Sequence, residues 1–320
     1  MGISTDYDMV IVGAGPAGMA AAIYGSRMGW RTLVLDKGAV GGLAATTPII
    51  ENYPGFSEIT GMEFAERLRK QAEKFGATIQ ELVEVTDIEC DKLPIKVITT
   101  SGEFSAKVVI IATGTYHRHL NVIGESDFDG KGVSYCATCD GALYAHEKVA
   151  VIGGGNSAVT EALYLDNVVR KVYLIHRRDA LRAEESLQKQ ILNNSKVEFI
   201  WNSVIEEIEG NEFDGVKRLR IKNVKTEEED SLRVKAVFIA IGIIPNNELA
   251  KKIGINLTEN GLIIVDKNQR TNIPRIYAAG DITPGQGQIS VAVGEGTTAA
   301  ISAFLDMKGG DWYGQETSTG

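Results

Sequence analysis

Two cysteines separated by two residues carry the clearest chemical signal in this sequence. They occur in the run Cys136-Ala137-Thr138-Cys139-Asp140, shortly before the glycine-rich segment 153–158. A Cys-x-x-Cys pair can close a small disulfide and reopen it as a dithiol, with one thiolate stabilised by its neighbours, so it carries two electrons reversibly. Beside a nucleotide motif, this pair indicates a redox enzyme.

Two glycine-rich motifs have the form that cradles a dinucleotide. They are Gly13-Ala14-Gly15-Pro16-Ala17-Gly18 and Gly153-Gly154-Gly155-Asn156-Ser157-Ala158. Such a motif alone is weak, because glycine turns also mark simple tight connections. Here each motif follows an apolar strand-like run and precedes a helical stretch and a second strand, which favours nucleotide binding. The chain therefore builds a βαβ unit twice, and the small Ala158 is acceptable as the third residue of its motif.

The residue at the end of the second strand distinguishes the two motifs. Asp36 and His176 lie at the same interval from their first glycines. A carboxylate there accepts hydrogen bonds from ribose hydroxyls and repels a 2′-phosphate, so Asp36 fits FAD. In the second unit His176-Arg177-Arg178 replaces the acid, and we expect Arg182 one helical turn after Arg178 on the same face. Guanidinium groups form bidentate hydrogen bonds with phosphate oxygens, so this cluster predicts a binding site for the 2′-phosphate of NADPH. The alternative is that these basic residues lie at a solvent-exposed helix start and bind no phosphate.

Length and composition limit the class of protein. With 320 residues and 44% hydrophobic content, the chain can form two domains with packed cores. No apolar stretch approaches the ~20 residues of a membrane helix, and residues 1–8 lack the pattern of a signal peptide. A net charge of −9 argues against nucleic-acid binding. We expect a soluble cytoplasmic protein without a metal site, in which Cys90, the third cysteine, is a strand residue without chemistry.

Together, these motifs resemble the low-molecular-weight, prokaryotic-type thioredoxin reductases. The resemblance extends from about Tyr7 to Lys308 and includes the cysteine run, both glycine motifs, the segments 176–179 and 182–183, and Ala278-Ala279-Gly280-Asp281-Ile282. It implies an α/β fold in which an FAD domain, residues 1–117 and 246–320, is interrupted by an NADPH domain, residues 118–245, that carries the cysteines. Each domain should have a parallel sheet with helices on one side and a small antiparallel meander on the other. We expect the polar tail 314–320 to be frayed.

The resemblance also assigns site residues. Gly280 and Asp281 would close the FAD site, Gln288 and Ile289 would lie along the flavin, and Asn52 would lie beside the isoalloxazine. The other implied FAD contacts are Gly13, Gly15, Pro16, Ala17, Gly18, Asp36, Lys37, Gly41, Gly42, Leu43, Thr46, Thr113 and Gly114. The implied NADPH contacts are Gly153, Gly155, Asn156, Ser157, Ala158, His176, Arg177, Arg178 and Arg182. For the FAD contacts other than glycines, a purely structural turn is the alternative.

The implied reaction passes electrons from NADPH to the flavin, then to the Cys136–Cys139 disulfide, and finally to a disulfide on a protein partner. By resemblance, Cys139 is the thiol nearer the flavin and Cys136 attacks the partner. Asp140 is the expected acid and base, because a carboxyl group with a raised pKa can supply a proton to a leaving thiolate; a simple surface aspartate is the alternative. One flavin face cannot hold nicotinamide and disulfide together, so the central domain should rotate on linkers near 117–120 and 242–247.

The partner is less defined than the redox chemistry. We expect thioredoxin or a related small disulfide protein, and, from the resemblance, a homodimer. Ala142-Leu143 stands where many relatives have two aromatics that receive thioredoxin, and Gly287 stands where some have a basic residue. Two other functions compete: a flavoprotein exchanging electrons with ferredoxin or another low-potential carrier, and a flavin sensor without turnover. The cysteine pair, Asp140 and the arginine cluster weigh against both.

Overall fold

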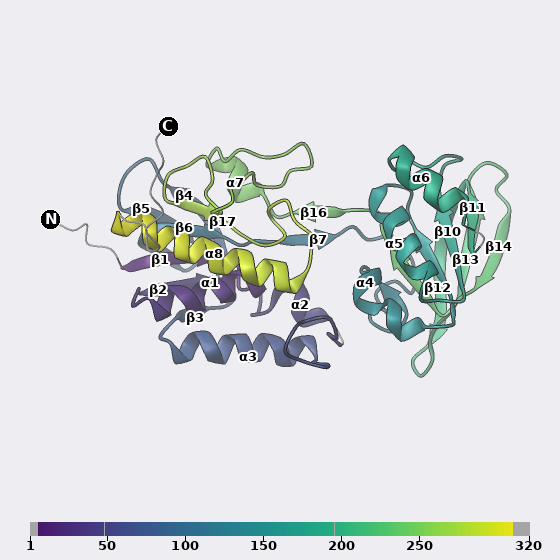
Figure 1. Cartoon of the computed structure of the whole chain (residues 1–320), viewed down its shortest axis with the longest axis horizontal. Coiled ribbons are helices and arrows are strands. Elements are labelled where there is room, and N and C mark those ends of the chain that lie inside the picture. Colours follow the sequence, from purple (N-terminus) through teal and green to yellow (C-terminus); the bar gives the residue numbers. More distant parts are fainter. Residues whose placement is uncertain (1–5, 48, 195, 310–320) are drawn as a thin grey trace, which may run out of the picture. The chain divides into compact units, whose positions relative to one another are not determined.

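In the computed structural model the chain leaves one folded unit, builds a second, and returns to the first. Unit 1 comprises Met1–Tyr116 and Ile244–Gly320, and unit 2 comprises His117–Ile243. The structure describes residues 6–47, 49–194 and 196–309. The chain crosses between the units through β7 (Thr115–His117) and β16 (Ile243–Pro245), which pair with each other (Figure 1). The observed boundaries lie next to the crossings expected at 117/118 and 245/246.

Unit 1 is built on one seven-stranded sheet in the order β3-β2-β1-β6-β5-β4, with β17 also paired to β6. The second half of β6 pairs in parallel with β1, and its first half pairs antiparallel with β5. The meander therefore continues from the parallel sheet through one long strand. The strands are β1 (Tyr7–Val12), β2 (Thr32–Leu35), β3 (Thr78–Gln80), β4 (Val85–Glu89), β5 (Ile95–Thr99), β6 (Gly102–Ile111) and β17 (Ile276–Ala278).

Helices cover the sheet of unit 1 because its central strands are apolar on both faces. Met9, Val10 and Ile11 of β1 are fully buried, as is typical of a parallel sheet covered on both sides. Helix α1 lies between α8 and α3 (Figure 1). The helices are α1 (Pro16–Arg27), α2 (Gly42–Thr46), α3 (Gly61–Lys74), α7 (Glu248–Lys252) and α8 (Ile289–Lys308).

Unit 2 repeats the plan with a separate meander. Its parallel sheet has the order β11-β10-β9-β15-β8, from β8 (Val133–Ser134), β9 (Lys148–Ile152), β10 (Lys171–His176), β11 (Val197–Trp201) and β15 (Ala236–Ile239). Helices α4 (Ala137–Asp140), α5 (Asn156–Asp166) and α6 (Glu185–Leu192) and the 3₁₀ turn η1 (Gly141–Tyr144) complete this layer. The antiparallel sheet contains β12 (Ser203–Asn211), β13 (Gly215–Asn223) and β14 (Glu229–Arg233). The predicted α/β class with parallel sheets is confirmed.

Smaller expectations have mixed outcomes. Cys90 follows β4 directly instead of lying in the strand, and it packs half-buried against the core of unit 1. Burial raises the pKa of its thiol. The tail 314–320 lies outside the described residues. Within the described chain, no helix has both the length and the apolar character needed to cross a membrane.

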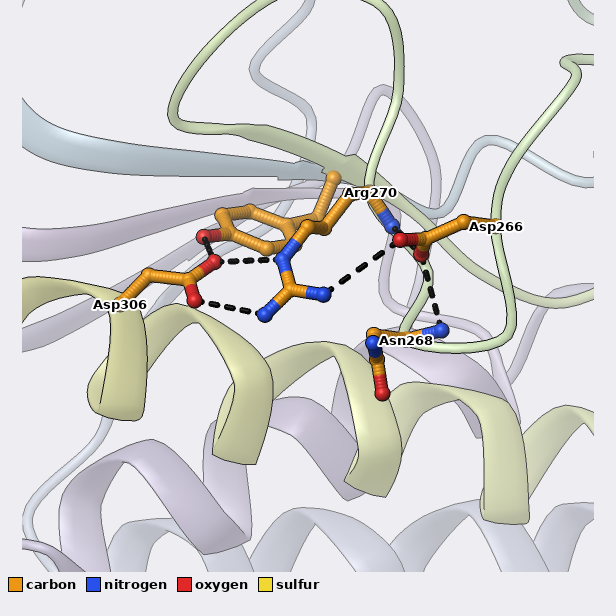
Figure 2. A network of polar contacts seen from close by, with 5 residues as sticks. Asp266, Asn268, Arg270 and Asp306 are labelled. Carbon is orange, nitrogen blue, oxygen red and sulfur yellow. Dashed lines mark hydrogen bonds and ion pairs between the residues drawn. The ribbon is translucent and has the colours of Figure 1, made fainter. Parts of the chain in front are cut away.

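A polar network ties the last turn of α8 to β17 and to the loop before it (Figure 2). Arg270 donates from Nε and Nη2 to the two carboxylate oxygens of Asp306, at 2.7 and 2.6 Å. The Tyr277 hydroxyl donates to Asp306 at 2.6 Å, and Arg270 also contacts Asp266 at 3.4 Å. The hydrogen bond from Arg270 lowers the pKa of Asp306 most, and Tyr277 adds to the effect.

We predict that Tyr277→Phe lowers the free energy of unfolding by about 1.5 kcal/mol, because a part-buried hydrogen bond to a charged carboxylate is lost. Asp306→Ala should cost more, since it leaves both Tyr277 and Arg270 without their acceptor. Chemical unfolding at pH 7 measures both, with Tyr24→Phe as the control because Tyr24 lies exposed on α1.

The Asp306→Ala defect should depend on pH in a defined direction. Because the folded pKa of Asp306 is lowered, its contribution is present above the ordinary carboxyl pKa of about 4 and is lost as the pH falls through the folded value. The stability difference from the unsubstituted protein should therefore shrink on acidification. A difference that stays constant down to pH 3 would contradict this account.

Candidate functional site

The two cysteines meet in a single helical turn. Strand β8 ends at Ser134, and Cys136, with an extended backbone, caps the start of α4. The backbone N–H groups of Cys139 and Asp140 both donate to the Cys136 carbonyl, at 3.2 and 3.1 Å. This turn brings the two Cα atoms to 5.3 Å, and a disulfide joins the side chains. Both cysteines are half-buried.

The acid beside the disulfide is partly buried and hydrogen-bonded. The Ser134 hydroxyl donates to Asp140 Oδ2 at 2.6 Å. Burial raises the pKa of Asp140, the Ser134 hydrogen bond opposes this, and the negative charge of Asp129 adds to the rise. The net pKa lies above the ordinary carboxyl value, so this group is suited to exchanging a proton. Cys136, Cys139 and Asp140 therefore lie together at one helical turn.

The first glycine motif forms a tight turn between β1 and α1. Gly13 has a φ of +110°, and a Cβ there would collide with the carbonyl oxygen of Ala112, the residue directly after the neighbouring strand β6. Gly15 caps the start of α1, and a Cβ there would meet no atom within 4 Å. The backbone at the N-terminus of α1 is therefore open to a ligand, with the geometry that suits a phosphate.

Asp36 is held beside this turn by the backbone. Its Oδ2 accepts from the Ala14 N–H at 2.6 Å and its Oδ1 from the Gly38 N–H at 2.7 Å. These two bonds orient the carboxylate next to the glycine turn. Lys37, the next residue, is exposed.

The second glycine motif repeats the first in unit 2. A Cβ on Gly153 would collide with the Ala240 carbonyl, as one on Gly13 would with Ala112. Gly155 caps α5, and a Cβ there again meets nothing within 4 Å. Asn156, the first residue of α5, binds Glu184 through its amide oxygen and nitrogen, at 2.8 and 2.9 Å. This pair ties the start of α5 to the start of α6.

His176, the counterpart of Asp36, has a different environment. It is only 4% exposed and lies against Gly154, where a Cβ would crowd the imidazole. Within the described chain its Nε2 has no hydrogen-bond partner. Burial lowers the pKa of His176, and the positive charge of Arg182 lowers it further. His176 is therefore a neutral packing group near pH 7, while the cations stand on its exposed neighbours.

Three exposed arginines follow His176, but one detail of their expected arrangement is wrong. Residues 177–180 form bends and α6 begins only at Glu185, so Arg178 and Arg182 do not share a helix face. Instead, the Arg182 N–H donates to the Gly154 carbonyl at 2.6 Å, which brings Arg182 to the glycine turn. Because the Arg182 N–H is bonded to Gly154, it cannot donate to a carbonyl four residues earlier, as a helix through Arg178 and Arg182 would require. The periodicity of the sequence does not reveal such a long-range hydrogen bond.

Most other implied flavin contacts lie in unit 1, at the starts of helices or directly after strands. The Asn52 side chain donates to Gln288 at 3.2 Å, so these residues meet despite their distance in sequence. Gln288 caps α8 and Ile289 is its first residue. Gly41 caps α2, which contains Gly42, Leu43 and Thr46. Thr113, Gly114, Gly280 and Asp281 follow the strands β6 and β17.

Two residues of this region were missed by sequence analysis. Glu295 accepts from the Gly280 N–H at 2.7 Å and the Thr283 hydroxyl at 3.1 Å, next to Asp281. Burial raises the pKa of both Glu295 and Asp281. Asn246 exchanges two 2.8 Å hydrogen bonds with Thr113. A single acid in the otherwise apolar start of α8 was the available signal for Glu295.

The comparison with known proteins assigns the chain to a family. Residues 7–296 match the pattern of the pyridine nucleotide-disulphide oxidoreductases. The chain belongs to this family. It is 42% identical over 303 residues to the thioredoxin reductase of Listeria innocua, covering 93% of this chain and 92% of that protein. Identity to the Bacillus subtilis thioredoxin reductase is 41% over 299 residues, covering 92% and 93%.

A solved structure gives the same result. The crystal structure of thioredoxin reductase from Streptococcus pyogenes matches with a TM-score of 0.90 at 41% identity, covering 95% of this chain and 99% of that chain. The resemblance to low-molecular-weight thioredoxin reductases is confirmed, and with it the class of flavoprotein oxidoreductase.

We predict that His176 titrates below the ordinary histidine pKa of about 6.5, because burial and the nearby arginines disfavour its charged form. An NMR titration of the imidazole measures the midpoint, with His176→Gln used to assign the signal. A midpoint above the ordinary value would mean that a charged imidazole stands beside the three arginines, which would contradict the packing role.

Proposed function

We propose that this protein is an NADPH-dependent thioredoxin reductase. The observation that carries the proposal is the Cys136–Cys139 disulfide at a one-turn helix beside a partly buried acid, within the same unit as a nucleotide-type glycine turn. A disulfide reductase uses this cysteine pair to carry two electrons, whereas a ferredoxin-linked flavoprotein or a flavin sensor has no use for it. The curated relatives, which are thioredoxin reductases, support the same activity.

Unit 1 fits FAD. The open N-terminus of α1 suits a pyrophosphate, and the fixed Asp36 carboxylate suits the hydroxyls of an unphosphorylated ribose. Asp281, the Asn52–Gln288 pair and the first residue of α8 complete the proposed site. When bound, FAD would take a hydride from NADPH and pass two electrons to the disulfide.

Unit 2 fits NADPH. The open turn at Gly155 suits the pyrophosphate, and Arg177, Arg178 and Arg182 offer exposed guanidinium groups where an NAD site carries an acid. The neutral His176 would contribute shape rather than charge. The bond from Arg182 to Gly154 supports the proposed 2′-phosphate site, because it fixes this arginine's backbone to the turn that would hold the pyrophosphate.

The chain's own chemistry is a thiol–disulfide exchange. After reduction, the Cys136 thiolate attacks a disulfide sulfur of the partner, forming a mixed disulfide and releasing one partner thiolate. The Cys139 thiolate then attacks Cys136 Sγ, which restores the internal disulfide and releases the second partner thiolate. Asp140 supplies and recovers the proton at the leaving sulfur, for which its raised pKa suits it.

The setting of this reaction follows from the same proposal. The disulfide and the NADPH site lie in one unit, so we expect them to reach the flavin in alternation, with β7 and β16 as the linkers. We further propose a cytoplasmic homodimer that reduces thioredoxin or a related small disulfide protein. The exposed Leu143 in place of an aromatic residue would alter the contact with that partner.

The decisive test counts thiols. Under anaerobic conditions, NADPH should raise the thiols measured in the denatured, FAD-loaded protein by two per chain, because only the cysteine pair is reduced. The chain has three cysteines, so Cys90 supplies the constant background.

Cysteine variants serve as controls for this count. Cys136→Ser and Cys139→Ser should abolish reduction of a protein disulfide while NADPH still bleaches the flavin in stopped-flow absorbance. Cys90→Ser should behave as the unsubstituted protein does. No new thiols after full flavin bleaching would favour the ferredoxin-type alternative.

We predict that Arg177→Ala, Arg178→Ala and Arg182→Ala each raise the NADPH KM by about tenfold, because a charged hydrogen bond contributes roughly 1.5–3 kcal/mol. NADH kinetics should barely change, since NADH lacks the 2′-phosphate. Arg233→Ala, on the exposed strand β14, is the matched control. Equal losses with both nucleotides would mean that these arginines support the fold instead.

A further inference from the structure

A buried serine connects the acid of the disulfide site to the first cysteine. Ser134, the last residue of β8, is only 3% exposed. Its hydroxyl oxygen lies 2.6 Å from Asp140 Oδ2, 3.1 Å from the Cys136 backbone nitrogen and 3.4 Å from the Cys136 carbonyl oxygen. One hydroxyl therefore contacts both the acid and the peptide groups at the start of α4.

The hydrogen-bonding capacity of a serine matches this environment. A hydroxyl has one donor and two acceptor positions, and the Cys136 N–H occupies one acceptor position. When Asp140 is ionised, the hydroxyl proton points to Oδ2. When Asp140 is protonated, its own O–H can donate to the second acceptor position, and the serine proton can turn to the Cys136 carbonyl. Both charge states are then satisfied by rotation of one hydroxyl.

We propose that Ser134 is a positioning residue that keeps Asp140 hydrogen-bonded while this acid gives up and recovers its proton. The inference rests on the proposed function, because it requires Asp140 to exchange a proton with a thiol. The same hydroxyl holds the Cys136 N–H, so the position of the first cysteine and that of the acid are set by one side chain.

Other ionisable groups near Asp140 cannot replace this contact. Asp129, in the loop before β8, is negative and raises the pKa of Asp140. The charge of Asp140 raises the pKa of Tyr144 on η1, to which burial contributes most. Cys139 lies on the same helix as Asp140, and Cys136 caps the start of that helix. On α5, which packs against α4, the Tyr164 ring lies so close to Gly141 that a Cβ there would crowd it, and Glu161 precedes Tyr164 by three residues on the same face of α5. Burial and Asp129 raise the pKa of Asp140, and the hydrogen bond from Ser134 is the interaction that lowers it.

The test compares Ser134→Ala with a matched control. Ser203→Ala removes another buried hydroxyl of unit 2, one that donates to the Trp201 carbonyl and does not contact Asp140. The readout is the pH dependence of protein-disulfide reduction by pre-reduced enzyme in single turnover. The ionisation midpoint assigned to Asp140 should move up by about one pH unit in Ser134→Ala, because burial and Asp129 then act unopposed. Ser203→Ala should leave it unchanged.

Two further variants make the result specific. Asp140→Asn should lack this midpoint. The double variant with Asp140→Asn and Ser134→Ala should lack it too, and its pH profile should match that of Asp140→Asn alone. Ser134→Thr keeps a hydroxyl and should keep the original midpoint, so it also tests the inference if Ser134→Ala does not fold.

A second readout separates this inference from the proposed function. NMR titration of the Asp140 carboxyl carbon reports its pKa without turnover and should show the same upward shift in Ser134→Ala. An unchanged titration in Ser134→Ala, or a shifted one in Ser134→Thr, would overturn the inference even in an active enzyme. If the unsubstituted protein fails to reduce any protein disulfide, the proposed function fails, while the carbon titration still decides whether Ser134 controls Asp140.

Discussion

In each unit the arrangement depends on the close approach of a glycine to the carbonyl that directly follows the neighbouring strand. Gly13 meets Ala112 in unit 1, and Gly153 meets Ala240 in unit 2. Any side chain at these positions would separate the turn from the sheet. Because the contact is made, each strand passes directly into a helix whose N-terminus opens at the carboxyl edge of the sheet. The proposed FAD and NADPH sites both depend on this backbone contact.

On this shared plan, the two units differ in charge and burial beyond the turn. In unit 1 an acid ends the second strand and is fixed by two backbone N–H groups. In unit 2 a buried neutral histidine takes that position, and the charge moves to exposed arginines beside it. The same backbone therefore offers a hydrogen-bond acceptor in one unit and cations in the other, which is the difference expected between sites for an unphosphorylated and a phosphorylated ribose.

The redox centre uses little structure of its own. One helical turn and the end of a two-residue strand place a disulfide, an acid and a serine hydroxyl in contact. Such a short helix gains little stability by itself, so packing of α4 against α5 must hold it. The position of the acid is then sensitive to its few buried partners, and this is why a single hydroxyl can affect its proton exchange.

The sequence by itself determined the features that depend on neighbouring residues: the strand–turn–helix units, the glycine positions and the pairing of Cys136 with Cys139. Local spacing is enough for these, because the partners lie within a few residues or follow a regular period. Only the tertiary structure decided which distant groups meet. The bonds from Arg182 to Gly154, from Gly280 to Glu295 and between Thr113 and Asn246 join segments far apart in the chain. A buried polar group bonds to whatever partner the fold brings to it, and local spacing does not reveal which partner that is.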